Sequence, residues 1–159
     1  MIRRTPLKRK SPLKPQSVKK KKPKTLKSKL IEQLDAEFSK YIRLKYSDSN
    51  GYCRCISCGR IFFWKEIQNG HYMSRRYFST RWSEDNCRPQ CVACNMFNQG
   101  NIQMYRRGLI KQIGEQRVDL VEALARQSSD NKSEFEYAAM IKDFKKEVIA
   151  LLKKKGLTI

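Results

Sequence analysis

Two Cys-x-x-Cys motifs are the feature that most constrains how this chain can fold. Cys55 and Cys58 form the first pair and Cys91 and Cys94 the second, with 32 residues between the pairs. A Cys-x-x-Cys turn directs two thiolates toward one point, and two such turns complete a tetrahedral Zn²⁺ site. Buried reduced cysteines would not explain the paired spacing. Because four sulfurs leave no open position for a substrate, we expect a structural zinc that contributes on the order of 10 kcal/mol to folding.

The other two of the six cysteines are Cys53 and Cys87. Either can in principle ligate, but Cys-x-Cys and Cys-x-x-x-Cys are less usual zinc spacings, so we expect free thiols. The basic N-terminus is not followed by the apolar segment of a signal peptide, and no apolar run approaches the ~18 residues of a membrane-spanning helix. We therefore expect a cytoplasmic protein with no membrane partner, whose cysteines bind metal in a reducing compartment.

The charge of the chain predicts a polyanionic partner. The 159 residues carry a net charge of +20 and give an isoelectric point near 10.0. Residues 1–24 hold eleven Lys and Arg and no acid, so they predict a basic tail that is disordered when free. Without those eleven residues the rest of the chain still carries +9. DNA is the first candidate partner, and the tail is interpreted as a phosphate-binding arm, with a solubilising or targeting arm as the alternative.

A helix is predicted to begin near Thr25, ahead of the cysteine-rich segment. Its apolar residues recur every four positions, at Leu26, Leu30, Leu34, Phe38 and Ile42. The polar run 47–51 breaks this pattern. Residues 52–100 are then rich in cysteine, aromatic residues, glycine and asparagine, with short β-like runs such as Ile61–Trp64. This segment predicts a small sheet held together by zinc.

Helical patterns return in the second half of the chain. One helix is expected from Met104 to Ile113 and another from Arg117 to Arg126. A last helix is expected to begin at Ser133, with Glu136 completing a capping box. Its inward face is predicted to hold Phe135, Ala138, Ala139, Ile141, Phe144, Val148, Leu151 and Leu152. Gly114 and Gly156 are the expected ends of the first and last of these helices.

Together these patterns predict an α+β protein with four regions. They are a disordered basic tail at 1–24, an N-terminal helix at 25–50, a zinc-stapled core at 51–110 and a C-terminal helical region at 111–159. The N- and C-terminal helices are expected to flank the core.

Several strings around the second cysteine pair resemble those of the phage NinG/Rap recombination proteins. The resemblance covers roughly residues 52–145. It is carried by Asn69-Gly70-His71-Tyr72, the run from Thr80 to Asn86, Gln90-Cys91-x-x-Cys94-Asn95, Gly100-Asn101 with Tyr105, Leu109-Ile110 and Ile113-Gly114. It implies an HNH (ββα-metal) core like that of endonuclease VII, and an endonuclease acting on Holliday junctions and related branched DNA. It also implies the host cytoplasm, if the chain is phage-encoded, and recombination proteins as possible partners.

The same resemblance implies roles for three residues. His71, the one histidine of the chain, would act as the general base that activates water, since an ordinary pKa near 6.5 suits that task. Its role as a metal ligand instead remains open. Asn95 would supply an amide oxygen to a catalytic Mg²⁺ or Mn²⁺, and Asn86 would orient the histidine loop by backbone hydrogen bonds.

One position departs from the HNH pattern. Many such enzymes carry an Asp or His directly before the base as a second metal ligand, and here that position is Gly70. Glu84 and Asp85 are the nearest acids in sequence. Glu84, which matches the family pattern better, is interpreted as a ligand or a group behind the ligands, with an ordinary capping or surface acid as the alternative.

Six arginines near the motif are candidate phosphate contacts, because guanidinium groups suit bidentate binding of phosphate. They are Arg75, Arg76, Arg81, Arg88, Arg106 and Arg107. Recognition of backbone and shape is expected rather than of sequence. Among the nearby aromatic residues, Trp82 is expected in the core, whereas Tyr72, Tyr77 and Phe78 either stack on unpaired bases or belong to the core. A homodimer is expected because junction resolution needs two symmetric cuts, with the terminal helices either at its interface or packed within one subunit.

Two other readings fit part of these data. A non-catalytic zinc-finger protein that assists recombination explains the cysteines and the charge, and Gly70 favours it. A ribosome-associated zinc ribbon explains the same features but gives no role to the Gly-His-Tyr string. A metal-dependent, structure-specific endonuclease accounts for all of them.

Overall fold

The computed structural model describes residues 23–127 and 132–158, so the predicted tail falls outside the described residues except for Pro23 and Lys24. Helix α1 (Leu26–Lys45) begins where the sequence predicts, with the Thr25 hydroxyl accepting a hydrogen bond from the Ser28 amide. Leu34, Phe38 and Ile42 of the predicted stripe are buried in the main core. Leu26 is 59% exposed, because it lies on the first turn, beyond the elements that α1 packs against.

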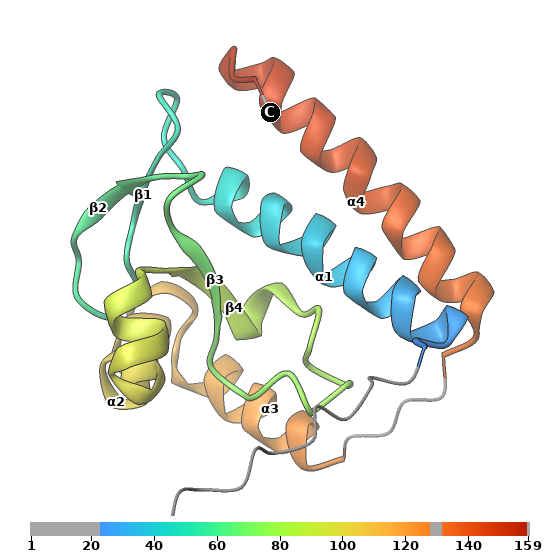
Figure 1. Ribbon diagram of the computed structural model, residues 1–159. Coiled ribbons are helices and arrows are strands. Elements are labelled where there is room, and N and C mark those ends of the chain that lie inside the picture. The colour runs from blue at the N-terminus through green and yellow to red at the C-terminus, as the bar shows by residue number, and fades with distance from the viewer. Residues whose placement is uncertain (1–22, 128–131, 159) are drawn as a thin grey trace, which may run out of the picture.

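Helix α4 (Glu134–Lys155) lies beside α1 along its length (Figure 1). The predicted capping box of Ser133 and Glu136 is present, and Gly156 ends the helix with a positive φ of 62°. The two helices run in the same direction, since Lys27 at the start of α1 donates to the Lys132 carbonyl and Lys155 at the end of α4 donates to the Ser47 carbonyl. The two terminal helices therefore pack on each other within one subunit.

The inward face of α4 differs from the predicted one. Phe135 is 82% exposed, and Ala138 and Ala139 are exposed as well. The buried residues are Tyr137, Ile141, Val148 and Leu152. They follow the helical repeat from Tyr137, whereas Phe135 lies two positions earlier, about 200° around the helix. The sequence prediction was right for Ile141, Phe144, Val148, Leu151 and Leu152, which are buried or packed against the main core. It was wrong for Phe135, Ala138 and Ala139, because it counted apolar residues without their phase.

Two short antiparallel hairpins carry the middle of the chain. Strands β1 (Tyr52–Arg54) and β2 (Ile61–Phe63) form the first, and β3 (Gln68–His71) and β4 (Cys87–Gln90) the second. The first Cys-x-x-Cys turn lies in the loop between β1 and β2, and the second follows β4 directly. The Ile56 amide donates to the Pro89 carbonyl and ties the first turn to β4.

Helices α2 (Ile102–Ile113) and α3 (Glu115–Arg126) follow the second hairpin and meet at Gly114. Each begins two residues before the predicted start. They enclose a second, smaller core of Tyr72, Tyr105, Leu109, Val118 and Val121. The predicted α+β class is confirmed, because helices pack around two small two-stranded sheets, and short helical turns lie between β3 and β4 and between β4 and α2.

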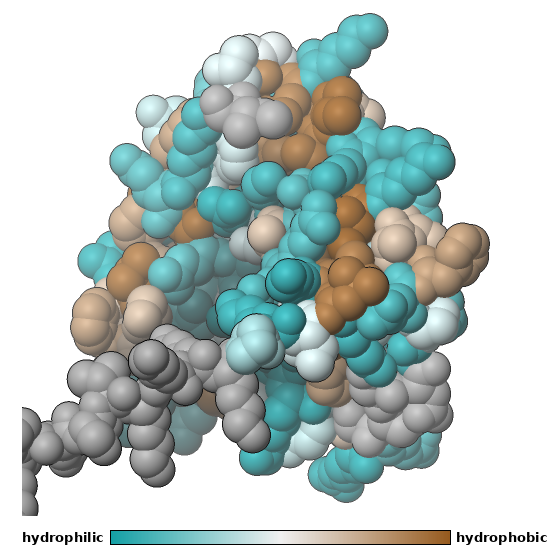
Figure 2. Space-filling model, turned by 45° about the vertical axis from the view of Figure 1, so that its right-hand side comes forward, coloured by the Kyte–Doolittle hydropathy of each residue, from teal (hydrophilic) through white to brown (hydrophobic). Residues whose placement is uncertain are grey.

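The surface is mostly hydrophilic in the view of Figure 2, with smaller apolar patches between the charged groups. Across residues 23–127 and 132–158, every helix is too short or too polar to cross a membrane.

Candidate functional site

The four cysteines of the two Cys-x-x-Cys motifs meet at one point. The sulfur atoms of Cys55, Cys58, Cys91 and Cys94 all lie within 4.8 Å of one another. The Cys58 and Cys91 sulfurs are 3.7 Å apart. In a tetrahedral site with Zn–S bonds of about 2.3 Å, neighbouring sulfurs are about 3.8 Å apart. The donor set and its spacing therefore fit a metal ion such as zinc.

Hydrogen-bond donors surround these sulfurs. The Cys91 amide donates to the Cys55 sulfur at 3.4 Å, and the Asn101 side-chain amide donates to the Cys94 sulfur at 3.7 Å. Arg60, which the sequence analysis did not single out, donates to the Cys58 and Cys91 sulfurs. Burial raises the pKa of Cys58, but the hydrogen bonds from Arg60, Cys55 and Cys94 together outweigh it and lower that pKa to about 6. A thiolate is thus already favoured at the most exposed of the four sulfurs.

Cys53 and Cys87 lie outside the cluster. Cys53 is buried and donates to the Arg43 carbonyl at 3.0 Å, and burial raises its pKa to about 11. Cys87 is buried in β4 beside Arg81, and burial raises its pKa as well. Both are free thiols, as their spacing predicted.

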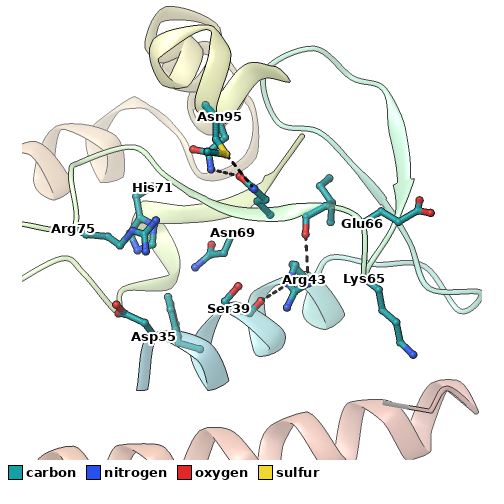
Figure 3. A pocket seen from close by; sticks show the side chains of 13 residues that line it. Asp35, Ser39, Arg43, Lys65, Glu66, Asn69, His71, Arg75 and Asn95 are labelled. Atoms are coloured by element: carbon teal, nitrogen blue, oxygen red, sulfur yellow. Dashed lines mark hydrogen bonds between the residues drawn. The ribbon is translucent and has the colours of Figure 1, made fainter. Parts of the chain in front are cut away.

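A cleft of about 540 Å³ is lined by Asn95, the residue that follows Cys94 of the cluster, and by groups from α1 and β3 (Figure 3). His71 and Asn95 both line it, although they are 24 positions apart in the sequence. Asp35 and Ser39 of α1 form one wall, Asn69 and His71 of β3 another, and Arg75 of the following loop lies at its rim. The structure therefore brings two of the predicted catalytic residues together in an open site.

The hydrogen bond of His71 fixes which ring nitrogen carries the proton. Its Nε2 lies 2.9 Å from the Arg81 carbonyl oxygen, which can only accept, so Nε2 donates and Nδ1 keeps its lone pair. Burial is the main reason that the pKa of His71 is lowered to about 4, with the positive charge of Arg75 acting in the same direction. His71 is therefore a neutral imidazole at neutral pH, with one nitrogen able to take up a proton.

Asn86 closes the loop that follows His71. Its side-chain oxygen accepts from the Met73 amide at 2.6 Å, and its side-chain nitrogen donates to the Met73 and Thr80 carbonyls at 3.0 Å each. Asn86 is fully buried and does not line the cleft. It acts on the backbone around His71 and not on a bound molecule.

Asn95 lies in a π-helical turn (Ala93–Phe97), and not at the start of the following helix, because α2 begins only at Ile102. A turn around Gly100, with φ of 80°, separates the two. The Asn95 side-chain nitrogen donates to the Gln68 side-chain oxygen at 2.7 Å, which leaves the amide oxygen of Asn95 for the cleft.

Neither acid nearest in sequence lines the cleft. Glu84 accepts hydrogen bonds from Tyr41 and Lys45, and these bonds outweigh its burial and lower its pKa. Asp85 is paired with Arg117 at 2.7 Å. The carboxylates that do line the cleft belong to Asp35 and Glu66.

Asp35 is a residue that sequence reasoning missed. Its carboxylate accepts from the Arg81 guanidinium at 2.5 and 3.0 Å and from the Trp82 indole at 2.9 Å. It lies 36 positions before His71, on a helix whose pattern predicted only an apolar face. A polar residue among the inward positions of that helix was the signal to follow.

The six predicted phosphate contacts divide into two groups. Arg75, Arg76 and Arg107 are exposed. Arg81 is paired with Asp35, and Arg106 with three acids of α3. Arg88 is only 2% exposed and donates to the Gln112 side chain and to the Glu84 and Cys87 carbonyls. The prediction for Arg88 was wrong, because its guanidinium satisfies groups inside the fold.

The aromatic residues near the cleft are largely structural. Trp82 is buried against Tyr137 of α4, with ring centroids 5.5 Å apart, as expected for a core residue. Tyr72 is also buried and stacks on Tyr105. Tyr77 and Phe78 are half-buried, with Arg76 and Arg81 over their rings.

Comparison with known proteins gives one consistent answer. The family model described as "Bacteriophage Lambda NinG protein" matches residues 3–155 of this chain. Protein ninG of Escherichia phage lambda is 34% identical over 94 residues, which are 58% of this chain and 44% of that protein. Protein ninG of Salmonella phage P22 matches with the same identity and coverage. The matched stretch is thus less than half the length of these relatives. No solved structure matches the chain.

Proposed function

We propose that this chain, which belongs to the NinG family, is a metal-dependent endonuclease with an HNH (ββα-metal) core. Its proposed substrate is branched DNA. The observation that carries the proposal is the single cleft that His71 and Asn95 both line. The order of β3, β4 and α2 supports it, because a histidine on the first strand of a hairpin and an asparagine just after the second are what an HNH core requires.

The cysteine cluster would hold a structural zinc in this proposal. Its four sulfurs join the loop after β1 to the turn after β4, so the metal would fix the distance between the two hairpins. A site filled by four sulfurs has no place for a phosphate. The chemistry therefore belongs to the neighbouring cleft.

His71 would serve as the general base. Nδ1 takes a proton from a water molecule, and the water oxygen forms a bond to the phosphorus of a backbone phosphodiester. The bond from phosphorus to the 3′-oxygen breaks, and that oxygen takes a proton from solvent, which leaves a 5′-phosphate and a 3′-hydroxyl. The Arg81 carbonyl favours this reaction, because it stabilises the imidazolium that forms through the Nε2 proton.

A Mg²⁺ or Mn²⁺ ion, when bound, would neutralise the charge that develops on the phosphate and on the leaving oxygen. The cleft fits such an ion, because it contains amide oxygens, which hard cations prefer. Asn95 would hold it through its side-chain oxygen. Arg75 would bind a neighbouring phosphate at the rim.

The net charge of +20 and the exposed arginines support DNA as the substrate, and the lack of a base-reading helix pattern supports recognition of shape. Two symmetric cuts would need a homodimer in the host cytoplasm. Since α1 and α4 pack on each other, the face of α4 turned away from α1 would be the part left for a partner subunit.

The test is incubation of the purified, zinc-loaded protein with four-way, flap and linear duplex DNA, with and without Mg²⁺. The expected result is Mg²⁺-dependent nicking of the branched substrates and little cutting of linear duplex. Tight binding to four-way DNA with no cutting in Mg²⁺ or Mn²⁺ would instead identify a non-catalytic protein that assists recombination.

A further inference from the structure

The proposed function leaves the second protein ligand of the catalytic cation without a residue, because Gly70 occupies the position that often carries it. The geometry of β3 explains why no ligand can stand there. A Cβ atom added at Gly70 would lie 2.4 Å from the side-chain oxygen of Gln90 and 3.0 Å from the ring of Tyr105. A side chain at this position would therefore point into the interior, away from the cleft.

The alternating side-chain directions of β3 place Asn69 on the same face as His71, toward the cleft. Successive side chains of a strand point to opposite faces, so Asn69 shares the side opposite Gly70 with His71. Both residues line the cleft, and Figure 3 shows the Asn69 amide between His71 and Ser39. The polar group closest in sequence to His71 on its own face is thus a carboxamide.

The oxygen of this carboxamide has no partner in the part of the chain that the structure describes. Asn69 is 8% exposed, and its side-chain oxygen is buried without a hydrogen bond. A buried carbonyl with no donor costs free energy, and structures rarely retain one without a use for it.

A second amide side chain, that of Asn95, lines the same cleft. The Asn95 nitrogen is held by Gln68, which turns the oxygen of Asn95 outward. Asp35 lies in the same cleft, where Arg81 pairs with its carboxylate, and Glu66 is the other carboxylate among the lining residues, beside the cations of Arg43, Lys65 and Arg75. Two neutral oxygens next to a carboxylate suit a hard divalent cation that keeps several of its water molecules.

We propose that the side-chain oxygen of Asn69 is the second protein ligand of the divalent cation, together with that of Asn95. This proposal rests on the proposed function only in assuming that the cleft takes a cation. It replaces Glu84, whose carboxylate is held by Lys45 and Tyr41 outside the cleft. Asn69 would thereby supply a neutral metal ligand, whereas many HNH proteins supply an Asp or His ligand at the next position.

The experiment measures Mn²⁺ binding to the full, zinc-loaded chain by electron paramagnetic resonance of free Mn²⁺, with no DNA present. Asn69→Ala is expected to raise the Mn²⁺ dissociation constant by about 10-fold or more. Even residues that only hold the ligands in place change metal affinity by about 10- to 100-fold. Asn69→Asp keeps the shape and adds a charged oxygen, so it is expected to bind Mn²⁺ more tightly than the wild type. Such a gain has no explanation in misfolding.

Glu84→Gln is the matched control, because it neutralises the competing carboxylate outside the cleft and should leave Mn²⁺ affinity unchanged. The inference is overturned if the wild type has no Mn²⁺ site at millimolar concentration. It is also overturned if both Asn69 variants bind like the wild type, or if Glu84→Gln removes the site. Mn²⁺ binding that follows Asn69 in a protein that cuts no DNA would refute the nuclease and leave this inference standing.

Discussion

The cysteine cluster and the cleft are neighbouring sites of opposite construction. The cluster is closed, with four sulfurs within 4.8 Å that come from two copies of one short turn. The cleft is open and collects its groups from α1, β3 and the π-helical turn. Sulfur suits zinc, whereas amide oxygens and carboxylates suit Mg²⁺ and Mn²⁺. On the proposed function, this contrast in ligand chemistry would keep two metals apart, even though Cys94 and Asn95 are adjacent residues.

Because Cys94 and Asn95 are adjacent, the cleft depends on the cluster for the position of Asn95, whereas the cluster does not depend on the cleft. Loss of the cluster would release the turn that carries Asn95, whereas loss of a group in the cleft leaves the cluster intact. A substitution in the cluster is therefore expected to disrupt the cleft, whereas a substitution in the cleft is expected to leave the cluster intact.

The largest effect is expected for Cys58→Ser. Removing one of four sulfurs should release the metal and with it a contribution on the order of 10 kcal/mol to folding. Residues 52–100 should lose their structure, which is measured by zinc content and circular dichroism. Cys53→Ala is the control, since Cys53 is buried outside the cluster and should keep one zinc per chain. A zinc-free wild-type chain that is fully folded would contradict the prediction.

A smaller and more selective effect is expected for His71→Ala. Without the base, junction cleavage should fall by about 10²- to 10⁴-fold, because general-base catalysis is worth about that much. Zinc content and the junction dissociation constant should stay at wild-type values, since the imidazole acts on water and adds little to ground-state binding. Cleavage at the wild-type rate would rule out the HNH assignment and leave the accessory-protein reading in its place.

The low pKa of His71 predicts a pH effect on stability. The pKa is about 4 in the fold against 6.5 for the ordinary side chain, so the unfolded chain takes up the proton first as pH falls. Stability contributed by the neutral imidazole is complete above about pH 6.5 and is lost as the pH falls toward 4. Between pH 7 and pH 5 this loss is about 2 kcal/mol.

The measurement is urea unfolding of the wild type and of His71→Asn at both pH values. The comparison cancels the protonation of the zinc thiolates, which both proteins share. Unfolding free energies that fall in parallel between pH 7 and pH 5 would show that His71 does not titrate with a lowered pKa.

The smallest effects are expected from two exposed arginines, one at each site. Arg75→Ala, at the rim of the cleft, should reduce the slope of log affinity for DNA against log salt by about 1 and leave zinc retention unchanged. Arg60→Ala removes donors to two cluster sulfurs, so it should weaken zinc affinity by about 10-fold and leave the salt slope alone. If both variants change both quantities, the two sites are not separable.

Sequence reasoning succeeded where a structure depends on residues close together in the chain. Cys-x-x-Cys spacing is enough to predict a shared point for four sulfurs, and Thr25, Ser133 and Gly156 mark the ends of their helices by local hydrogen bonds and backbone angles. Asp35 was missed because only the packing of α1 against β3 brings it to the cleft. Glu84 was favoured as a metal ligand because it lies close to Asn86 in sequence. The fold instead places its carboxylate against Lys45.

The pairing of α1 with α4 has a consequence for the order in which the protein is made. Asp35 and Ser39 belong to α1, and α1 packs along α4, whose last turn reaches back to Ser47. A ribosome makes α4 only after every residue of the cysteine cluster and the cleft. We therefore expect the nascent chain to take up zinc first and to complete the wall of its cleft last. If the chain has the proposed activity, this order would keep it inactive while it is still attached to the ribosome.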